Sequence, residues 1–98
     1  MLPFNEQVVL ISGASRGLGA ATARSFAREG AGVVVNYYES EDDAHALAET
    51  LTDDHPGAAL PVQADIRDRA AVQDMVETAA GHFGTPVTTI VHNALVDF

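Results

Sequence analysis

The stretch that decides the fold is Val8-Val9-Leu10-Ile11-Ser12-Gly13-Ala14-Ser15-Arg16-Gly17-Leu18-Gly19. Its four apolar residues predict a buried strand, and the glycines that follow lead into a helical pattern over 17–29. A strand that turns through glycines into a helix can hold phosphate, because backbone N–H groups and the positive helix end converge there. We assign Gly13 to the tight turn, Gly17 to close approach of a pyrophosphate, and Gly19 to close helix–sheet packing.

Outward from this stretch, strand and helix patterns alternate along the chain. Strands are expected at 7–11, 32–36, 58–63 and 87–91, and helices at 17–29, between Ser40 and His55, and between Asp68 and Gly84. This β-α-β-α-β-α-β order predicts an α/β fold with a parallel sheet and right-handed crossovers. No repeat, low-complexity segment or internal boundary interrupts it, so we expect residues 1–98 to belong to a single domain.

Local signals predict where the helices begin and end and which faces they bury. Ser40, with Asp43 three residues later, resembles a capping box, Asp68 is the expected cap of the third helix, and Gly30 and Gly84 are expected stops. The stripes expected to face the sheet are Leu18, Ala21, Ser25 and Phe26 on the first helix, Ala44, Leu47, Ala48 and Leu51 on the second, and Val72, Met75, Val76, Ala79 and Phe83 on the third.

The composition argues against several classes of function. The net charge is −9, with five arginines and no lysine, which disfavours a nucleic-acid surface and an anionic membrane surface. The absence of cysteine excludes a disulfide framework and fits a reducing cytoplasm. The chain has no apolar run of about 20 residues and no signal-peptide pattern, so we expect a cytoplasmic protein that starts at Met1. Its histidines share no metal-ligand spacing with a third ligand, so no metal site is expected.

The glycine motif by itself leaves more than one interpretation open. A plain structural turn is one of them, because turns into helices often contain glycine. A Walker-type phosphate loop is excluded, since it needs a lysine and the chain has none. The dinucleotide pattern G-x-G-x-x-G does not fit either, because the spacing here is G-x-x-x-G-x-G.

That longer spacing resembles the short-chain dehydrogenase/reductase family, whose first turn reads T/S-G-x-x-x-G-x-G. Ala64-Asp65-Ile66 follows the third expected strand, where the family places an Asp that meets the adenine ring. His92-Asn93-Ala94 follows the fourth, where the family has Asn-Asn-Ala-Gly. The three motifs cover essentially the whole chain, and segments 12–19 and 33–37 look most like the 3-oxoacyl-[acyl-carrier-protein] reductase branch. The resemblance implies the first half of a Rossmann-type doubly wound parallel sheet, with strand order 3-2-1-4.

The resemblance also implies a site for NADP(H). The residues expected to bind the cofactor are Gly13, Ser15, Arg16, Gly17, Leu18, Gly19, Asn36, Tyr37, Ala64, Asp65, Ile66, Asn93 and Ala94. NAD enzymes usually place an acid after the second strand, whereas Asn36 has no charge to repel a 2′-phosphate. The Arg16 guanidinium can pair with that phosphate. Tyr37 and Tyr38 are candidates to flank the adenine, although one of them can equally pack at the strand end.

Two positions depart from the family pattern after the fourth strand. His92 stands where the family has its first Asn, and Leu95 stands where the family has Gly. Asn93 can still support the loop and the ribose region of the cofactor. Leu95 adds bulk where the family backbone runs close to the cofactor, so the local geometry is expected to change while the fold is kept.

The chemistry that the resemblance implies is not carried by this chain. The family uses a Tyr, a Lys four residues later and an upstream Ser, but the chain has no Lys and only Tyr37 and Tyr38. We therefore expect no catalytic residue here, and reduction of a carbonyl, such as a 3-oxoacyl thioester, in a complete protein whose C-terminal half supplies the chemistry. That half is expected in the same gene product or a separate chain, and the complete protein as a homo-oligomer.

A second interpretation stays open beside the oxidoreductase. The chain can be a truncated, non-catalytic dinucleotide-binding or interaction protein. Segment 87–91 favours the first interpretation, because it carries no charge and no proline, the features that blunt natural sheet edges. It resembles an interior strand that pairs with a further segment.

Overall fold

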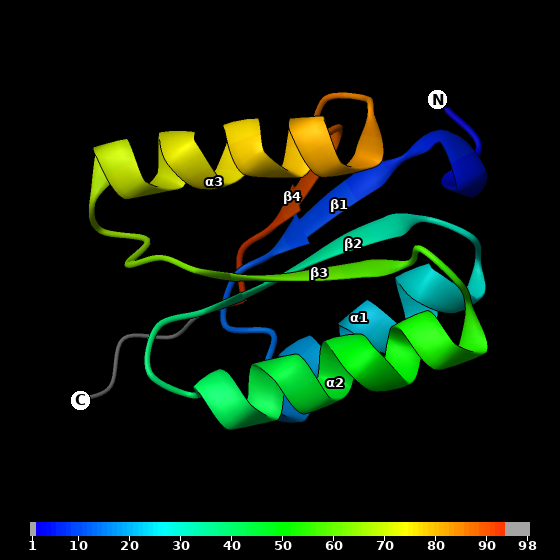
Figure 1. Cartoon of the computed structure of the whole chain (residues 1–98), viewed down its shortest axis with the longest axis horizontal. Helices are drawn as coiled ribbons and strands as arrows, with labels where there is room; N and C mark the ends of the chain where they lie inside the picture. The colour runs from blue at the N-terminus through cyan, green and yellow to red at the C-terminus, as the bar shows by residue number, and fades with distance from the viewer. Residues whose placement is uncertain (1, 94–98) are drawn as a thin grey trace.

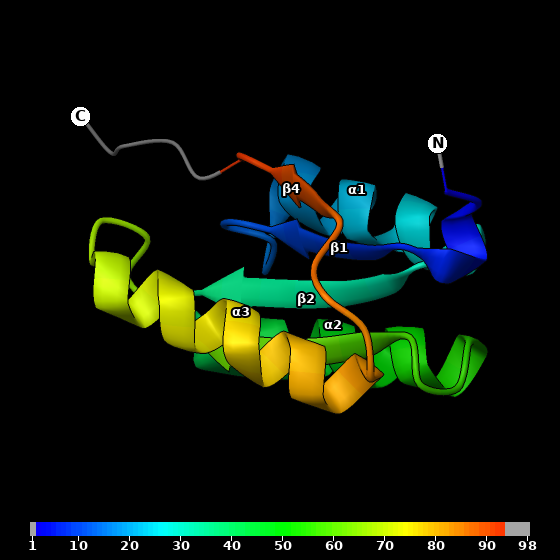
Figure 2. The ribbon, with the colours of Figure 1, turned by 90° about the horizontal axis from the view of Figure 1, so that it is seen from above.

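The computed structural model describes residues 2–93 and has three layers (Figures 1 and 2). A 3₁₀ turn, Phe4–Glu6, precedes the regular elements. In chain order these are β1 (Val8–Ile11), α1 (Gly17–Arg28), β2 (Gly32–Tyr37), α2 (Glu41–Asp54), β3 (Ala59–Gln63), α3 (Arg69–Phe83) and β4 (Thr89–Val91). The predicted alternation is confirmed, and most boundaries agree within one residue. Within residues 2–93, no helix is long and apolar enough to cross a bilayer.

The four strands form one parallel sheet in the order β3-β2-β1-β4, as expected. Val9 is paired with Val33 of β2 on one side and with Thr89 of β4 on the other. The chain adds β2 and β3 on one side of β1 and then crosses back to add β4 on the other side, so the strand order reverses between β1 and β4. In α/β sheets of this kind, ligands bind outside the carboxyl ends of the strands at such a reversal. The helices α1, α2 and α3 all begin at that edge (Figure 1).

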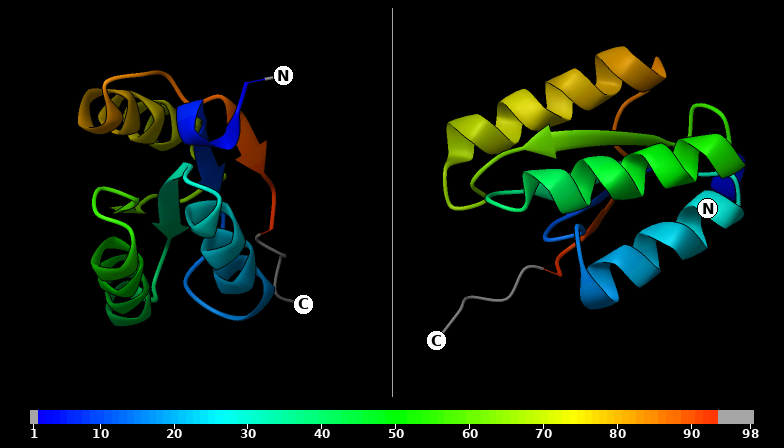
Figure 3. Two further views of the ribbon diagram at one scale, coloured as in Figure 1. Left: turned by 90° about the vertical axis from the view of Figure 1, so that its right-hand side faces the viewer. Right: turned by 60° about the horizontal axis from the view of Figure 1, so that its bottom comes forward.

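Each strand contributes alternate side chains to two cores, because successive side chains of a strand point to opposite faces. Helices α1 and α2 cover one face and α3 covers the other (Figure 3). The α1/α2 core holds the strand residues Val9, Ile11, Val33 and Val35. The α3 core holds the strand residues Val8, Leu10 and Val34. Because both faces are covered, β1 is fully buried, as its uninterrupted apolar sequence predicts.

The buried stripes of α2 and α3 are those predicted, but the stripe expected on α1 was wrong. Of that stripe only Phe26 packs against the core, while Leu18 is 75% exposed. The residues that α1 buries are Gly19, Ala20, Ala23 and Ala27. These small residues let the helix axis approach the sheet closely, and a search for large apolar side chains overlooks such a face.

The helix ends confirm two predicted signals and correct a third. Asp68 caps α3, with its carboxylate accepting from the N–H groups of Ala70 and Ala71 at 3.0 and 3.3 Å. Gly84 ends α3 in the left-handed conformation, with φ of 74°. Ser40 precedes α2, but its side chain makes no capping hydrogen bond, so the capping box is not formed. The acids of the first α2 turn stabilise that end through the helix dipole instead.

The fourth strand is shorter than predicted. It covers Thr89–Val91 instead of 87–91. Thr88 still holds the segment to β1, because its N–H donates to the Val8 carbonyl at 2.9 Å, and Val87 packs against the α3 core. In this chain β4 is an edge strand of the sheet, and Ile90 is 60% exposed. That a further segment pairs with this edge stays a prediction.

Candidate functional site

The turn after β1 lies at the carboxyl edge of the sheet and depends on its glycines. Gly13 and Gly17 have φ of 61° and 58°, a region that side chains rarely adopt. A Cβ at Gly17 would meet nothing within 4 Å, so the backbone is open to an approaching group at this point. The positive φ of Gly13 fits the tight turn predicted for it, while the approach of a pyrophosphate to Gly17 stays a prediction.

Gly19 is required by crowding. A Cβ there would lie 2.5 Å from the Gly13 carbonyl oxygen, 2.5 Å from Nδ2 of Asn93 and 2.9 Å from Cα of Ala14. Real Cβ atoms do not approach backbone this closely, so only glycine lets the helix start against the turn. Gly19 does serve close packing, but its neighbours belong to the glycine turn and to the segment after β4 and not to a strand, as the predicted helix–sheet packing would require.

The first turn of α1 offers backbone N–H groups. Its N-cap is Arg16, in an extended conformation, and no side chain caps this end. The N–H groups of Gly17, Leu18 and Gly19 therefore have no intrahelical acceptor. Leu18 lies in this turn with its side chain in solvent, and Ser15 precedes it, half-buried. The start of a 12-residue helix, where N–H groups have no intrahelical acceptor, is a favourable place for a phosphate.

Arg16 lies on the open side of the turn. Its Nε is 3.8 Å from Oδ2 of Asp43 in the first turn of α2, and the two side chains are 74% and 55% exposed. Such a long, solvated ion pair contributes little to stability. The guanidinium is thus held near the turn but keeps donors for a further anion.

The segment after β4 supports the turn from the other side. Asn93 donates its N–H to Oγ of Ser12 at 3.0 Å and its Nδ2 to the Gly13 carbonyl at 3.3 Å. His92 is exposed, with Nδ1 3.4 Å from Oγ of Ser12. The expected support of the loop by Asn93 is thereby confirmed, whereas Ala94 and Leu95 lie outside the described residues.

The end of β2 differs from what the sequence indicated. Asn36 is only 2% exposed, and its side chain contacts main-chain atoms of the turn after β1 and of the end of β3 with the turn that follows it. Tyr37 is also buried, at 7%, and belongs to the α1/α2 core. Tyr38, at 52%, is the aromatic residue that remains exposed at this edge. Of the two alternatives for the tyrosines, Tyr37 packs at the strand end and Tyr38 stays available for a ring system.

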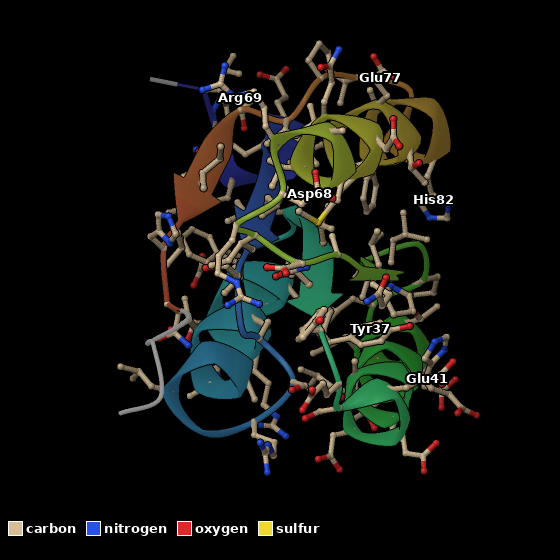
Figure 4. The ribbon with its side chains drawn as sticks, turned by 90° about the vertical axis from the view of Figure 1, so that its left-hand side faces the viewer. Tyr37, Glu41, Asp68, Arg69, Glu77 and His82 are labelled. Atoms are coloured by element: carbon tan, nitrogen blue, oxygen red, sulfur yellow. The ribbon has the colours of Figure 1, made fainter. Side chains whose placement is uncertain are left out.

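The Tyr37 hydroxyl lies against α2. It is 3.4 Å from Nε2 of His45, and the two rings meet edge to face with centroids 5.8 Å apart. Burial raises the pKa of Tyr37, and the nearby Glu41 carboxylate raises it further. Figure 4, which looks onto the carboxyl ends of the strands, shows Tyr37 beside the start of α2, where Glu41 lies. The raised pKa keeps the Tyr37 hydroxyl protonated, and the ring packs in the α1/α2 core.

The turn after β3 carries a closed ion pair. Arg67 donates Nε to Oδ1 of Asp65 and Nη2 to Oδ2, both at 3.0 Å, and its N–H also reaches Oδ1 at 2.9 Å. These hydrogen bonds hold the pKa of Asp65 below its ordinary value. Asp65, and after it the Tyr38 hydroxyl, raise the pKa of Arg67. Ala64, before the pair, is buried, and Ile66, within it, is half-buried.

The structure thus gathers three predicted segments at one edge of the sheet, and it adds two residues that the sequence analysis overlooked. Ser12 connects β1 to the end of β4 and is 2% exposed. Arg67 donates hydrogen bonds to the carboxylate of Asp65. The sequence signal for this ion pair was the opposite charge of two residues that are two positions apart. Among residues 2–93, no group of three His, Cys, Asp or Glu side chains is arranged to hold a metal ion.

A depression of about 340 Å³ lies at the opposite end of the sheet. Gly32 and Ala58, at the beginnings of strands, and Phe83, at the end of α3, line it. The glycine turn does not contribute to this depression, and ligands of α/β sheets bind at the other edge. We therefore place the candidate site at the carboxyl edge.

Comparisons with known proteins show the family of the chain. The family model described as short chain dehydrogenase matches residues 7–97. An uncharacterised oxidoreductase of Methylorubrum extorquens is 37% identical over 98 residues, which are 100% of this chain and 39% of the relative. A 3-oxoacyl-[acyl-carrier-protein] reductase of Synechocystis is 38% identical over 95 residues, covering 96% of this chain and 37% of that protein. The chain thus spans about two-fifths of the length of these relatives.

Solved structures give the same result. A short-chain dehydrogenase/reductase from Serratia marcescens is 40% identical, with a TM-score of 0.85 over 97% of this chain and 38% of that one. A doubly substituted short-chain dehydrogenase/reductase of Serratia marcescens is 39% identical, with a TM-score of 0.87 over 99% of this chain and 39% of that one. The match in sequence extends over nearly all of the chain, and so does the match in fold. The chain belongs to the short-chain dehydrogenase family.

Proposed function

We propose that this chain is the cofactor-binding portion of an NADP(H)-dependent short-chain oxidoreductase that reduces a carbonyl group by hydride transfer. The observation that carries the proposal is the uncapped start of α1, which adjoins the open backbone of Gly17 and the exposed Arg16. A dinucleotide needs such a place for its pyrophosphate. Residues 1–98 would form half of one Rossmann-type domain.

The residues present fit a nicotinamide dinucleotide. The N–H groups of Gly17, Leu18 and Gly19 would hold the pyrophosphate, and Asn93 keeps the turn in place through the Gly13 carbonyl. Ala64, Asp65 and Ile66 would border the adenine, with the exposed ring of Tyr38 beside them. When bound, the cofactor supplies the hydride.

The preference for NADP(H) rests on charge. Arg16 is exposed and only loosely paired, so its donors can meet a 2′-phosphate. The second nearby arginine, Arg67, is already closed onto Asp65 by two hydrogen bonds. We therefore assign recognition of the 2′-phosphate to Arg16.

The reacting groups would come from elsewhere in the complete protein. The chain has no lysine, and Tyr37, one of its two tyrosines, is buried. The Tyr and Lys of the family chemistry would belong to a C-terminal half of the fold, which would pair beside β4 and cover Ile90. A 3-oxoacyl thioester is the proposed substrate, supported by the 38% identity to the Synechocystis reductase. A homo-oligomer and a cytoplasmic location stay predictions.

Titration of the purified protein with NADPH and NADH tests the proposal, with binding followed by nucleotide fluorescence. Arg16→Ala should weaken NADPH binding by about 1.5–3 kcal/mol, the range for hydrogen bonds to charged groups, and leave NADH nearly unchanged. Arg24→Ala removes an exposed arginine further along α1 and serves as the matched control. Equal losses for both nucleotides would mean that Arg16 does not contact the 2′-phosphate.

The second candidate is a non-catalytic dinucleotide-binding or interaction protein. The feature that favours it is the lack of any Tyr–Lys pair four residues apart in this chain. It predicts that nucleotide binds to a stable monomer of this length. The oxidoreductase predicts association with a further half of the fold, so the mass of the native particle separates the two.

A further inference from the structure

One side chain connects the two loops that form the candidate site. Asn36, near the end of β2, accepts a hydrogen bond on Oδ1 from the Gly13 N–H at 3.4 Å. Its Nδ2 donates to the carbonyl oxygens of Val62 and Ala64 at 3.3 and 3.2 Å. Its own carbonyl accepts from the Ala14 N–H at 3.0 Å. The glycine turn after β1 and the turn after β3 are thus bridged through one buried amide.

Only an amide fits this environment. Oδ1 faces an N–H donor, while Nδ2 faces carbonyl acceptors, so the two ends of the group need opposite hydrogen-bonding character. An ionised carboxylate of the same shape would keep the acceptor for Gly13 but would place a charge against the oxygens of Val62 and Ala64. Because Asn36 is 2% exposed, water cannot relieve that repulsion.

We propose that Asn36 is a positioning residue, which fixes the glycine turn to the turn after β3 and does not contact the cofactor. The proposal rests on the proposed function only where it names the cofactor, because the bridge between the loops follows from the hydrogen bonds of Asn36. Dinucleotide-binding folds often place an acid at the end of this strand, where it binds the ribose hydroxyls. We assign position 36 a different role, which is to hold the two loops together. In this chain an acid at that position would break the bridge between the loops and would not create a preference for NAD.

The wild-type protein provides the first test, by NMR. Both Asn36 side-chain amide protons should exchange slowly with solvent and show contacts to Val62 and Ala64. The side chain of Asn5, an exposed asparagine, is the internal reference for free exchange. Exchange of the Asn36 amide as fast as that of Asn5 would overturn the proposal without any variant having to fold.

Substitutions provide the second test. Asn36→Asp should lower the urea midpoint at pH 8, and part of the loss should return near pH 5, where the protonated carboxyl regains one donor. The Gly13 and Ala64 amide resonances should shift with it. Asn5→Asp makes the same chemical change at an exposed site and should have no such effect. Wild-type stability at pH 8 with unmoved Gly13 and Ala64 resonances would contradict the bridge.

Nucleotide binding provides the third test and separates this proposal from the proposed function. Asn36→Asp should raise the Kd for NADPH and for NADH by the same factor, about tenfold, as expected for one lost hydrogen bond. A selective gain for NADH would show that position 36 faces the ribose and would overturn the proposal. If the wild-type protein binds neither nucleotide, the proposed function fails, while the NMR result still decides whether Asn36 bridges the two loops.

Discussion

Nδ2 of Asn93 donates to the Gly13 carbonyl at 3.3 Å and thereby joins the end of β4 to the turn after β1. A Cβ at Gly19 would clash with the same two atoms. The segment that follows the last strand therefore sets the shape of the first turn. Residues 80 positions apart in the sequence act together at this edge.

Gly19→Ala is predicted to destabilise the protein and weaken dinucleotide binding. The added Cβ would have to displace the Gly13 carbonyl or Asn93, and such overpacking costs about 1–3 kcal/mol. Gly81→Ala is the matched control, because it also lies in a helix and its Cβ would meet nothing within 4 Å. The control should raise stability by about 0.5–1 kcal/mol. Urea unfolding followed by circular dichroism measures both, and similar midpoints for the two variants would contradict the crowding at Gly19.

Arg67→Ala is predicted to raise the pKa of Asp65 toward its ordinary value of about 3.9. In the wild type, hydrogen bonds from Arg67 lower the pKa of Asp65. The pair therefore stabilises the fold at pH values above the ordinary pKa of the carboxyl group. That contribution is lost as pH falls through the lowered pKa. NMR titration of the Asp65 carboxyl carbon measures the shift. Arg69→Ala, an exposed arginine at the start of α3, should leave the titration unchanged, and an equal response in both variants would argue against the pair.

The 98-residue chain alone is predicted to catalyse no carbonyl reduction. Its two tyrosines are adjacent, at 37 and 38, and the chain has no lysine to lower a tyrosine pKa. Oxidation of NADPH by the purified chain, with 3-oxoacyl thioesters and simple ketones as substrates, provides the assay. A mock purification sets the background. If the chain shows turnover above that background, and Arg16→Ala abolishes this turnover, the chemistry belongs to this chain and the prediction is wrong.

The outer edge of β4 is predicted to be paired in the native particle. Segment 87–91 has no charged residue and no proline, and Ile90 is 60% exposed in this chain. A parallel neighbour, from the same gene product or from a second copy, would cover both. Amide exchange should then be slow at every residue of Thr89–Val91. Slow exchange at alternate amides only, in a monodisperse monomer, would show that the edge is tolerated.

Much of the fold was predictable because its signals are local. The apolar run of β1 indicates a strand buried on both faces, and the stripe from Ala44 to Leu51 indicates the buried face of α2. Asp68 and Gly84 mark the ends of α3 through the hydrogen bonds and backbone conformations that these residue types favour. The three motifs at strand ends indicate the edge where the site lies, since parallel strands place their carboxyl ends together.

What the sequence by itself determined is therefore the order of the elements, the two-sided core and the sheet edge at which the three motifs gather. Only the tertiary structure decided how Asn36, Tyr37 and Asp65 are used. Asn36 points inward and donates to carbonyl oxygens at the end of β3. Tyr37 points inward and packs against helix α2. Asp65 is occupied because the turn after β3 folds Arg67 back onto it. The partners of Asn36 and Tyr37 come from other segments of the chain, and residue type and spacing alone do not specify them. The spacing of Asp65 and Arg67 was a signal, but only the fold of the turn closes the pair.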